Sequence, residues 1–281
     1  MNKIIVRQLG FSVVELLVAL VLSGFIILGV SKVYLEHKKV YLLQQSYSAV
    51  IENSRFATLV LEDLLGKAGY RRSIAQPMHE AFPATTQLGK YCDGFVSESV
   101  VTKIKNKGDS QQVGFCLRYQ PAYSGELVCD GSNAHVFHNV PFEPSGVNEI
   151  IYVAVLFTPH NDIADQGTLK CITDKGEMEI LEGVADMRVE FGVSDDGSKI
   201  LKKDQPFIMV TDWSEQDGIV RALRYSLLFA SRKGQRNVDS NAFQYWLSSA
   251  SSRVKARLKQ QDDMNVYKIV RGGQALRNMT P

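Results

Sequence analysis

The sequence predicts an α+β protein in which one long N-terminal helix packs on an antiparallel β-sheet with disulfide-stapled loops. Apolar residues recur at helical spacing from residue 11 to residue 65, and no Gly or Pro lies between Val30 and Gly66. After Pro77 the pattern changes to short runs that alternate with period two and are separated by Gly, Asp, Asn and Pro. The 281 residues, 45% hydrophobic and 22% charged, are enough to bury a proper core.

The first part of the helix is apolar enough to cross a membrane. The twenty residues from Phe11 to Val30 include only three polar side chains, those of Ser12, Glu15 and Ser23, and about 20 apolar residues span a bilayer. A charged group at that depth costs roughly 2.5 to 3.5 kcal/mol on insertion scales. We therefore expect Glu15 to reach the interface, stay protonated or find a partner.

The charges before this segment predict its orientation. Lys3 and Arg7 precede it without an acidic residue, so the positive-inside rule places the N-terminus in the cytoplasm and the rest of the chain outside. A secretory signal peptide would need a small-residue cleavage site after the apolar run, and Gly29-Val30-Ser31 fits that pattern poorly. Without cleavage the run would be a plain signal anchor, which could carry a periplasmic enzyme or a binding module.

The helix divides the chain into four parts. Residues 1–10 form a cytoplasmic leader, 11–33 the transmembrane half of the helix, 34–66 its outer half, and 67–281 a β-rich globular domain outside the membrane. A helix from Phe11 to Leu65 is about 80 Å long at 1.5 Å per residue, and Gly66 and Gly69 are expected to end it. The outer half should supply the apolar layer behind the sheet.

The β-rich part contains nine candidate strands. They are Phe95–Ile104, Val113–Tyr119, His135–Val140, Glu149–Phe157, Thr168–Ile172, Glu177–Leu181, Ala185–Phe191, Ile219–Ala230 and Val266–Val270.

The clearest alternation lies between residues 186 and 191. Met187, Val189 and Phe191 are expected to face the core, whereas the charged residues between them are expected to face water. Residues 242–260 fit both a helical stripe and a strand, and we expect a short helix there.

The four cysteines indicate an oxidising compartment. None of them has the two-residue spacing of a zinc or thioredoxin-like site. Three disulfide connectivities are possible, and we expect Cys92 to pair with Cys116 and Cys129 with Cys171. Each bond would contribute roughly 3 to 4 kcal/mol in the chain-entropy model. The alternative is four buried free thiols.

The sequence contains no recognised catalytic motif. It has no phosphate-binding glycine loop, no G-x-S-x-G elbow and no H-E-x-x-H zinc motif. His135 and His138 are expected on opposite faces of a strand, which argues against a shared metal. We therefore expect no catalytic residue, no metal and no cofactor, and a protein that is not an enzyme.

Positive charge is concentrated in the C-terminal fifth of the chain. Residues 232–281 carry ten Lys and Arg against three Asp, a net charge of +7, whereas residues 1–231 carry 22 basic against 27 acidic residues, a net charge of −5. Such a segment could face nucleic acid, anionic lipid or an acidic partner. A solvated face is the simpler interpretation.

The position of Glu15 suggests a role in assembly. If the chain is cut after Gly10, the new amine of Phe11 could pair with Glu15 of a neighbouring chain and neutralise both groups in lipid. A head-to-tail pairing of this kind does not close and generates a filament. A tolerated Glu near the membrane interface is the alternative.

The opening residues resemble a known signal. Gly10-Phe11-Ser12-Val13-Val14-Glu15, after a short basic leader and before an apolar helix, is similar to the class III signal of type IV pilins and pseudopilins. The resemblance implies that a prepilin peptidase cuts after Gly10 and methylates Phe11, and that Glu15 serves filament assembly. Val13 stands where leucine is commoner, which is a mild departure.

Further segments narrow the resemblance to the PilW family of minor pilins. They are Glu52–Ala57, Ala68–Tyr70, Gly167–Cys171, Gly183–Gly192, Val220–Arg224 and Leu276–Asn278. Residues 71–165 and 236–265 carry little that matches.

The PilW resemblance implies a minor subunit that helps to initiate pilus assembly in a priming or tip complex and so supports twitching motility, adhesion or DNA uptake. Its partners would be the prepilin peptidase, other minor pilins and the major pilin, with a tip adhesin as a further candidate. Nucleic acid on the basic 232–281 region is a weaker hypothesis. The subunit would lie in the inner membrane before assembly and in the pilus at the cell surface afterwards. A type II secretion pseudopilin is the alternative within the class.

Overall fold

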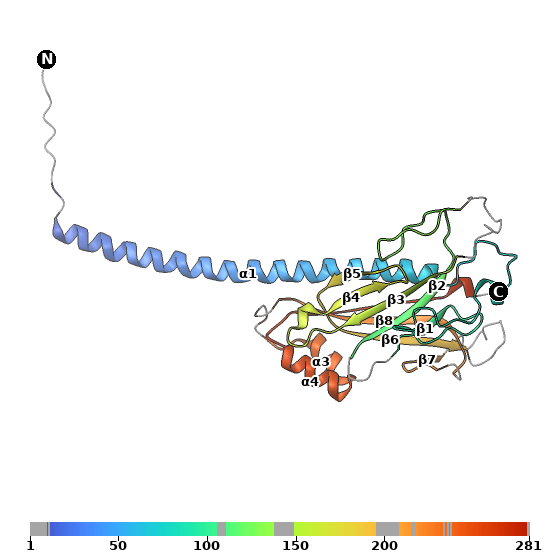
Figure 1. Ribbon diagram of the computed structural model, residues 1–281. Coiled ribbons are helices and arrows are strands. Elements are labelled where there is room, and N and C mark those ends of the chain that lie inside the picture. The colour runs from blue at the N-terminus through green and yellow to red at the C-terminus, as the bar shows by residue number, and fades with distance from the viewer. Residues whose placement is uncertain are drawn as a thin grey trace, which may run out of the picture. The chain divides into compact units, whose positions relative to one another are not determined.

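The computed structural model describes residues 10, 12–105, 111–137, 149–194, 208–214, 217–232, 234, 236 and 238–279. The chain forms two compact units, Met1–Gln45 and Ser46–Pro281. Helix α1, Val13–Lys67, contributes to both (Figure 1).

Helix α1 is continuous over 55 residues, as the sequence predicts. It ends at Lys67, so Gly66 lies inside it and Gly69 is the residue that terminates it. Gly69 has a φ of +73°, a left-handed conformation that favours glycine. Its N–H donates to the Arg118 carbonyl oxygen at 3.0 Å, which directs the chain into the β-rich unit.

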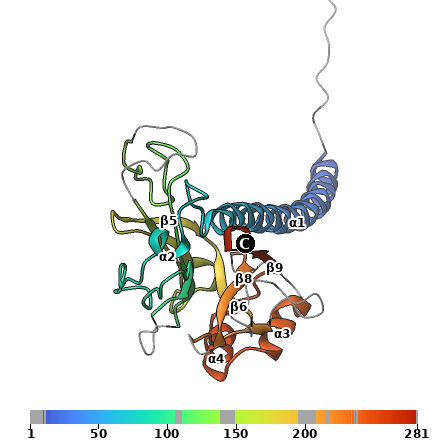
Figure 2. The ribbon, with the colours of Figure 1, turned by 90° about the vertical axis from the view of Figure 1, so that its right-hand side faces the viewer.

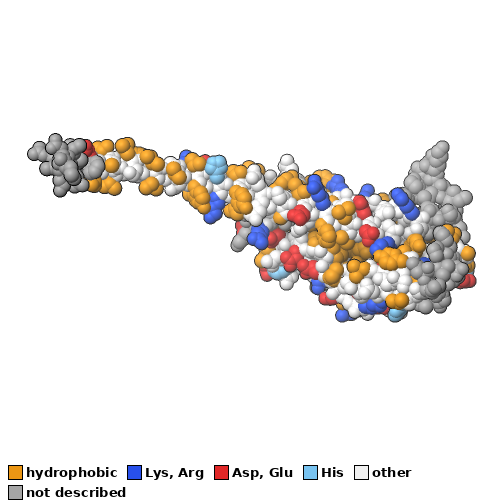
Figure 3. Space-filling view, turned by 90° about the horizontal axis from the view of Figure 1, so that it is seen from above, with side chains coloured by type: hydrophobic (Ala, Val, Ile, Leu, Met, Phe, Trp, Pro, Cys, Tyr) orange, Lys and Arg blue, Asp and Glu red, His pale blue; other side chains and the backbone are white. Residues whose placement is uncertain are grey.

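In the N-terminal unit the side chains of α1 are almost all exposed. Hydrophobic side chains cover much of this part of the helix in the view of Figure 3. Among the described residues, α1 is the one helix that is long and apolar enough to cross a membrane. A signal sequence near the N-terminus has the same length and composition, so this property fits a membrane anchor and does not define its topology.

The second unit contains two antiparallel sheets where the sequence predicted one. The first has the order β1-β2-β3-β4-β5 and the second the order β7-β6-β8-β9. Figure 2 shows β5 of the first sheet to the left of the C-terminal end of α1, and strands β6, β8 and β9 of the second sheet below it. The strands are β1 Val101–Lys103, β2 Val113–Tyr119, β3 Ile151–Thr158, β4 Thr168–Ile172, β5 Glu177–Glu182, β6 Val184–Ser194, β7 Ile208–Val210, β8 Ile219–Ala230 and β9 Tyr267–Ala275.

Both sheets and α1 share one hydrophobic core. Ala57, Leu61 and Leu65 of the helix are almost fully buried in a cluster that includes Leu117 of the first sheet and Met187 of the second. Burial of apolar surface is the main stabilising contribution to such a unit. The predicted α+β class is therefore confirmed, with the helix packed on antiparallel sheets.

The strand predicted at Phe95–Ile104 is wrong over most of its length. Only Val101–Lys103 forms a strand, because the chain turns before it. Glu98 has a φ of +67° and its N–H donates to the Phe82 carbonyl oxygen at 2.9 Å. The turn is fixed from β2 by the buried guanidinium of Arg118, which donates to four carbonyl oxygens, those of Phe82, Pro83, Val96 and Ser99.

Of the strand predicted at His135–Val140, residues 135–137 are not in a strand, and residues 138–140, which include His138, lie outside the described residues.

The C-terminal helical segment consists of two helices in place of the one predicted. Helix α3, Asn241–Ser248, and helix α4, Ser252–Gln261, are each capped by a serine side chain: Ser240 accepts from the Phe243 N–H and Ser251 from the Val254 N–H. A shorter helix, α2, spans Met78–Ala81, and two 3₁₀ helices span Ala164–Gln166 and Arg277–Met279.

Both disulfides have the expected pairing. Cys92 is bonded to Cys116, with 6.0 Å between the Cα atoms, and Cys129 to Cys171, with 5.9 Å. The first joins the loop before β1 to β2, and the second joins the 129 loop to β4. They therefore hold long loops to the first sheet.

We predict that Leu61→Ala lowers the free energy of unfolding by about 2 to 5 kcal/mol, because it leaves a cavity in the shared core. Leu59→Ala is the matched control on the same helix, since Leu59 is 68% exposed, and should change stability by less than about 0.5 kcal/mol. Urea unfolding of the detergent-solubilised chain measures both. Equal losses would show that α1 does not form the core.

Candidate assembly helix

The N-terminal end of α1 is closed by its own side chains. The Ser12 N–H donates to Oε2 of Glu15 at 2.9 Å, and Oγ of Ser12 accepts from the Val14 N–H at 3.3 Å. This reciprocal arrangement is a variant of the capping box in which the serine accepts from the second helical residue, and it satisfies helix N–H groups that have no partner inside the helix. The sequence signal for this cap is Ser12-x-x-Glu15, whereas the sequence interpretation considers for Glu15 only the membrane interface, protonation or a partner from another chain.

Glu15 therefore has a local role as well as its predicted one. Its carboxylate lies in the first turn, where the helix dipole favours negative charge. Gly10 is exposed and has no other atom near the position that a Cβ would occupy. Phe11 and the leader residues Lys3 and Arg7 lie outside the described residues.

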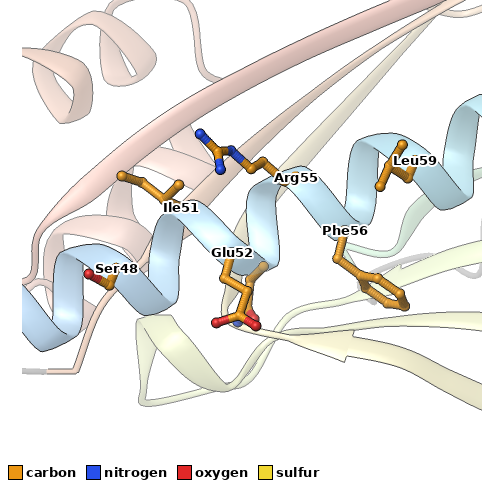
Figure 4. Close-up of a pocket in the computed structure, with 7 residues that line it drawn as sticks. Ser48, Ile51, Glu52, Arg55, Phe56 and Leu59 are labelled. Atoms are coloured by element: carbon orange, nitrogen blue, oxygen red, sulfur yellow. The ribbon is translucent and has the colours of Figure 1, made fainter.

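In the second unit α1 also has an uncovered face. A shallow hollow of about 630 Å³ lies along it, and its lining includes Ile51, Phe56 and Leu59. Phe56 and Leu59 are 48% and 68% exposed. Figure 4 shows the charged side chains of Glu52 and Arg55 on opposite sides of the helix in this view. This face combines exposed apolar and charged groups, whereas the opposite face forms the core.

Two asparagines attach α1 to distant parts of its unit. Nδ2 of Asn53 donates to the Glu182 carbonyl oxygen at 3.2 Å. Nδ2 of Asn278 donates to the carbonyl oxygens of Gly66 and Ala68 at 3.1 and 3.0 Å, where the helix ends. These contacts join the helix to residues that are 129 and more than 200 positions away in the sequence.

The charged face of β6 is covered at Asp186, contrary to the sequence prediction, whereas Arg188 and Glu190 are partly exposed. Asp186 is buried and accepts from Nη2 of Arg257 at 2.7 Å and from Nε1 of Trp246 at 2.8 Å. Burial raises the pKa of Asp186, while Arg257 and Trp246 act in the opposite direction. Helices α3 and α4 cover Asp186: α3 supplies Trp246 and α4 supplies Arg257.

The basic C-terminal region is partly internal. Arg257 pairs with Asp186, and Arg236 forms an ion pair with Asp262. These contacts bind the segment to its own domain. The Arg236–Asp262 pair lies within the segment and is already balanced in its net charge of +7, whereas Asp186 lies outside it and neutralises one further cation. Arg253, Lys255 and Lys259 of α4 are at least partly exposed. The contribution of residues 232–281 to binding a polyanion is therefore smaller than the net charge implies.

No metal-binding cluster is found where the structure is described: no three His, Cys, Asp or Glu side chains there lie close enough to hold an ion. Tyr119 and Tyr225 are buried, and burial raises the pKa of Tyr225 to about 12. A phenol with such a pKa stays protonated at neutral pH.

Comparison with known proteins gives only a weak structural similarity. No family model matches the sequence, and no curated protein matches it. Among solved structures, the chain is similar to the type IV-like pilin TTHA1219 from Thermus thermophilus, with 13% identity and a TM-score of 0.39 over 84% of this chain and 97% of that chain. A similarity at this level carries no weight for function, which has to be inferred from the chain's own residues.

We predict that Arg257→Met destabilises the chain by about 3 to 5 kcal/mol, because it leaves Asp186 buried without its counter-ion. The double variant Asp186→Leu with Arg257→Met should lose less than the single one, since no buried charge remains. Thermal unfolding followed by circular dichroism compares them, with Lys259→Met as an exposed control on α4. A double variant as unstable as the single one would contradict the role of the ion pair.

Proposed function

We propose that this chain is a minor subunit of a type IV pilus that helps to initiate pilus assembly. One observation carries the proposal: a helix without interruption begins at Val13, next to the Gly10-Phe11 junction, and continues into the core of the β-rich unit. A plain signal anchor has no reason to continue as the core helix of the domain that it anchors.

The proposal assigns a role to each N-terminal residue. A prepilin peptidase would cut after Gly10 and methylate Phe11, and residues 11–33 would remain in the inner membrane with the β-rich part outside. In the uncut chain Glu15 accepts the Ser12 N–H. Cutting creates an ammonium group on Phe11, and a charge-assisted bond from this group of one chain to Glu15 of the next would fix the axial offset between their helices.

In this mechanism the subunit lowers the cost of starting a filament. Its apolar helix segment would begin the bundle that major subunits extend, together with other minor pilins and a tip adhesin. Motility, adhesion and DNA uptake would follow from the pilus. The exposed apolar side chains of α1 before Ser46 support this proposal, because they require cover from lipid or from other helices once outside lipid.

Two other functions compete with this one. A type II secretion pseudopilin would have the same N-terminal chemistry and differ in the machine that it serves. A signal-anchored periplasmic enzyme or binding module would keep its leader. Copurification with sheared pili distinguishes a pilus subunit from a type II secretion pseudopilin. An uncut N-terminus identifies a signal-anchored enzyme or binding module.

We predict that the mature chain, purified from cells that contain a prepilin peptidase, begins at Phe11 and carries one added methyl group. Gly10→Val should retain the leader, because a branched side chain replaces a hydrogen at the cut. Mass spectrometry of the N-terminal peptide measures both. An intact Met1 and an unmethylated Phe11 in the wild-type chain would overturn the pilin proposal.

We predict that Glu15→Ala leaves membrane insertion intact and strongly reduces pilus number or incorporation of the subunit, because the inter-chain pair is lost. Glu15→Gln is the matched variant: it keeps a capping acceptor for the Ser12 N–H and removes the charge. Membrane fractionation and counts of sheared pili give the result. Normal pili in both variants would contradict the pairing role of Glu15.

A further inference from the structure

Strand β6 of the second sheet is paired along the whole of one edge but along only part of the other. β8 pairs with β6 from Val184 to Ser194, whereas β7 pairs only with Phe191, Gly192 and Val193. Short β7 is labelled beside β6 in Figure 1. At the other end of β6 the Val184 N–H donates to the Gly167 carbonyl oxygen at 3.1 Å. Between these points the open edge of β6 consists of residues 187–190.

The described part of the chain supplies no backbone partner to this open edge. Residues 187–190 pair with β8, and no backbone–backbone hydrogen bond connects them to another strand or loop described in the structure. The Met187 N–H also donates to the neighbouring Asp186 carboxylate. An unpaired strand edge presents N–H and C=O groups in the spacing that another strand requires. The open edge thus has the hydrogen-bonding pattern of a missing strand.

A groove runs along the open edge. It has a volume of about 680 Å³ and is lined by Met187 and Val189 of β6, by Val113 of β2, and by the Ser249–Ser251 connection between α3 and α4. Lys103 and Asp212, 3.3 Å apart, also line it, Lys103 at the end of β1 and Asp212 just after β7. The groove therefore offers an apolar inner side together with the strand edge.

The outer side of the groove carries two cationic side chains that have no ion-pair partner among the described residues that line it. Arg188 and Lys105 line it, and both donate to neutral acceptors. The Arg188 guanidinium binds Oγ of Ser249 and the Trp246 carbonyl oxygen, and Nζ of Lys105 reaches the Gly89 carbonyl oxygen at 3.4 Å. Three acidic residues also line the groove: Asp186 and Asp212 pair with Arg257 and Lys103, and Asp93 is the third.

We propose that the groove binds an extended segment of a partner protein that adds to β6 as a strand, antiparallel to it and in line with β7. Successive side chains of a strand point to opposite faces. Apolar side chains of the segment would lie on Met187, Val189 and Val113, and acidic side chains between them would face Lys105 and Arg188. This is peptide recognition by strand addition, in which the backbone gives affinity and the alternate side chains give specificity.

This inference goes beyond a role in starting a pilus and does not depend on it, because it rests on the β-rich unit alone. A signal-anchored binding module could use the same groove. The proposal also assigns the second sheet a binding role in addition to its packing against α1.

The test uses the full-length chain in detergent and a synthetic capped peptide, Gly-Val-Glu-Val-Glu-Val-Gly. Fluorescence anisotropy of the labelled peptide should show saturable binding. A peptide with the same side chains and alternate backbone nitrogens methylated should bind roughly tenfold more weakly or worse, because it loses at least two backbone hydrogen bonds. Equal binding of the two peptides would overturn strand addition.

A charge exchange tests the outer side of the groove. Lys105→Glu should weaken the Glu-containing peptide and favour the version with Lys in place of Glu, whereas Lys259→Glu, on α4 and outside the groove lining, should change neither. Hydrogen exchange of the free chain provides a further readout. If the amides of residues 187–190 are all protected as strongly as those of β8, the chain already occupies its own edge and the proposal fails.

Discussion

The second unit depends on the burial of one face of α1. Ala57, Leu61 and Leu65 are almost fully buried between the two sheets, and without this layer each sheet would expose its inner face to water. Contacts far apart in sequence fix the position of the layer. Asn53 binds the chain where β5 ends, and Asn278 binds the end of the helix. The first and last parts of the unit are thereby joined at its core helix.

Much of this fold could be predicted from local patterns. α1, β2, β4 and β8 have strong periodicity, and their predicted and observed bounds agree within two residues. β7 and α2 are three and four residues long, too short for a pattern to emerge. The division into two sheets depends on Gly183, whose φ of +94° separates β5 from β6. A single glycine in the sequence does not indicate whether the next strand rejoins the same sheet.

Buried charge accounts for two further differences. Arg118 is fully buried and fixes a loop through carbonyl oxygens, and Asp186 is paired with Arg257, 71 residues away. Alternation alone assigns such residues to a wet face, because it contains no information on which helix will cover the strand. At the start of α1 the partners are close together in the sequence. The Ser12-x-x-Glu15 pattern is local, so the cap was predictable, whereas any pairing of Glu15 between chains is a property of the assembly.

The two disulfides also determine how far the chain can extend under tension. A fully extended residue spans about 3.3 to 3.6 Å. The bond between Cys129 and Cys171, which are separated by 42 positions, therefore withholds about 140 Å of contour length, and the bond between Cys92 and Cys116, separated by 24 positions, about 80 Å. If a subunit is pulled from both ends, its core can unfold, but the two closed loops add no length while the disulfides remain intact. Oxidation thus shortens the tether that the domain forms when it unfolds.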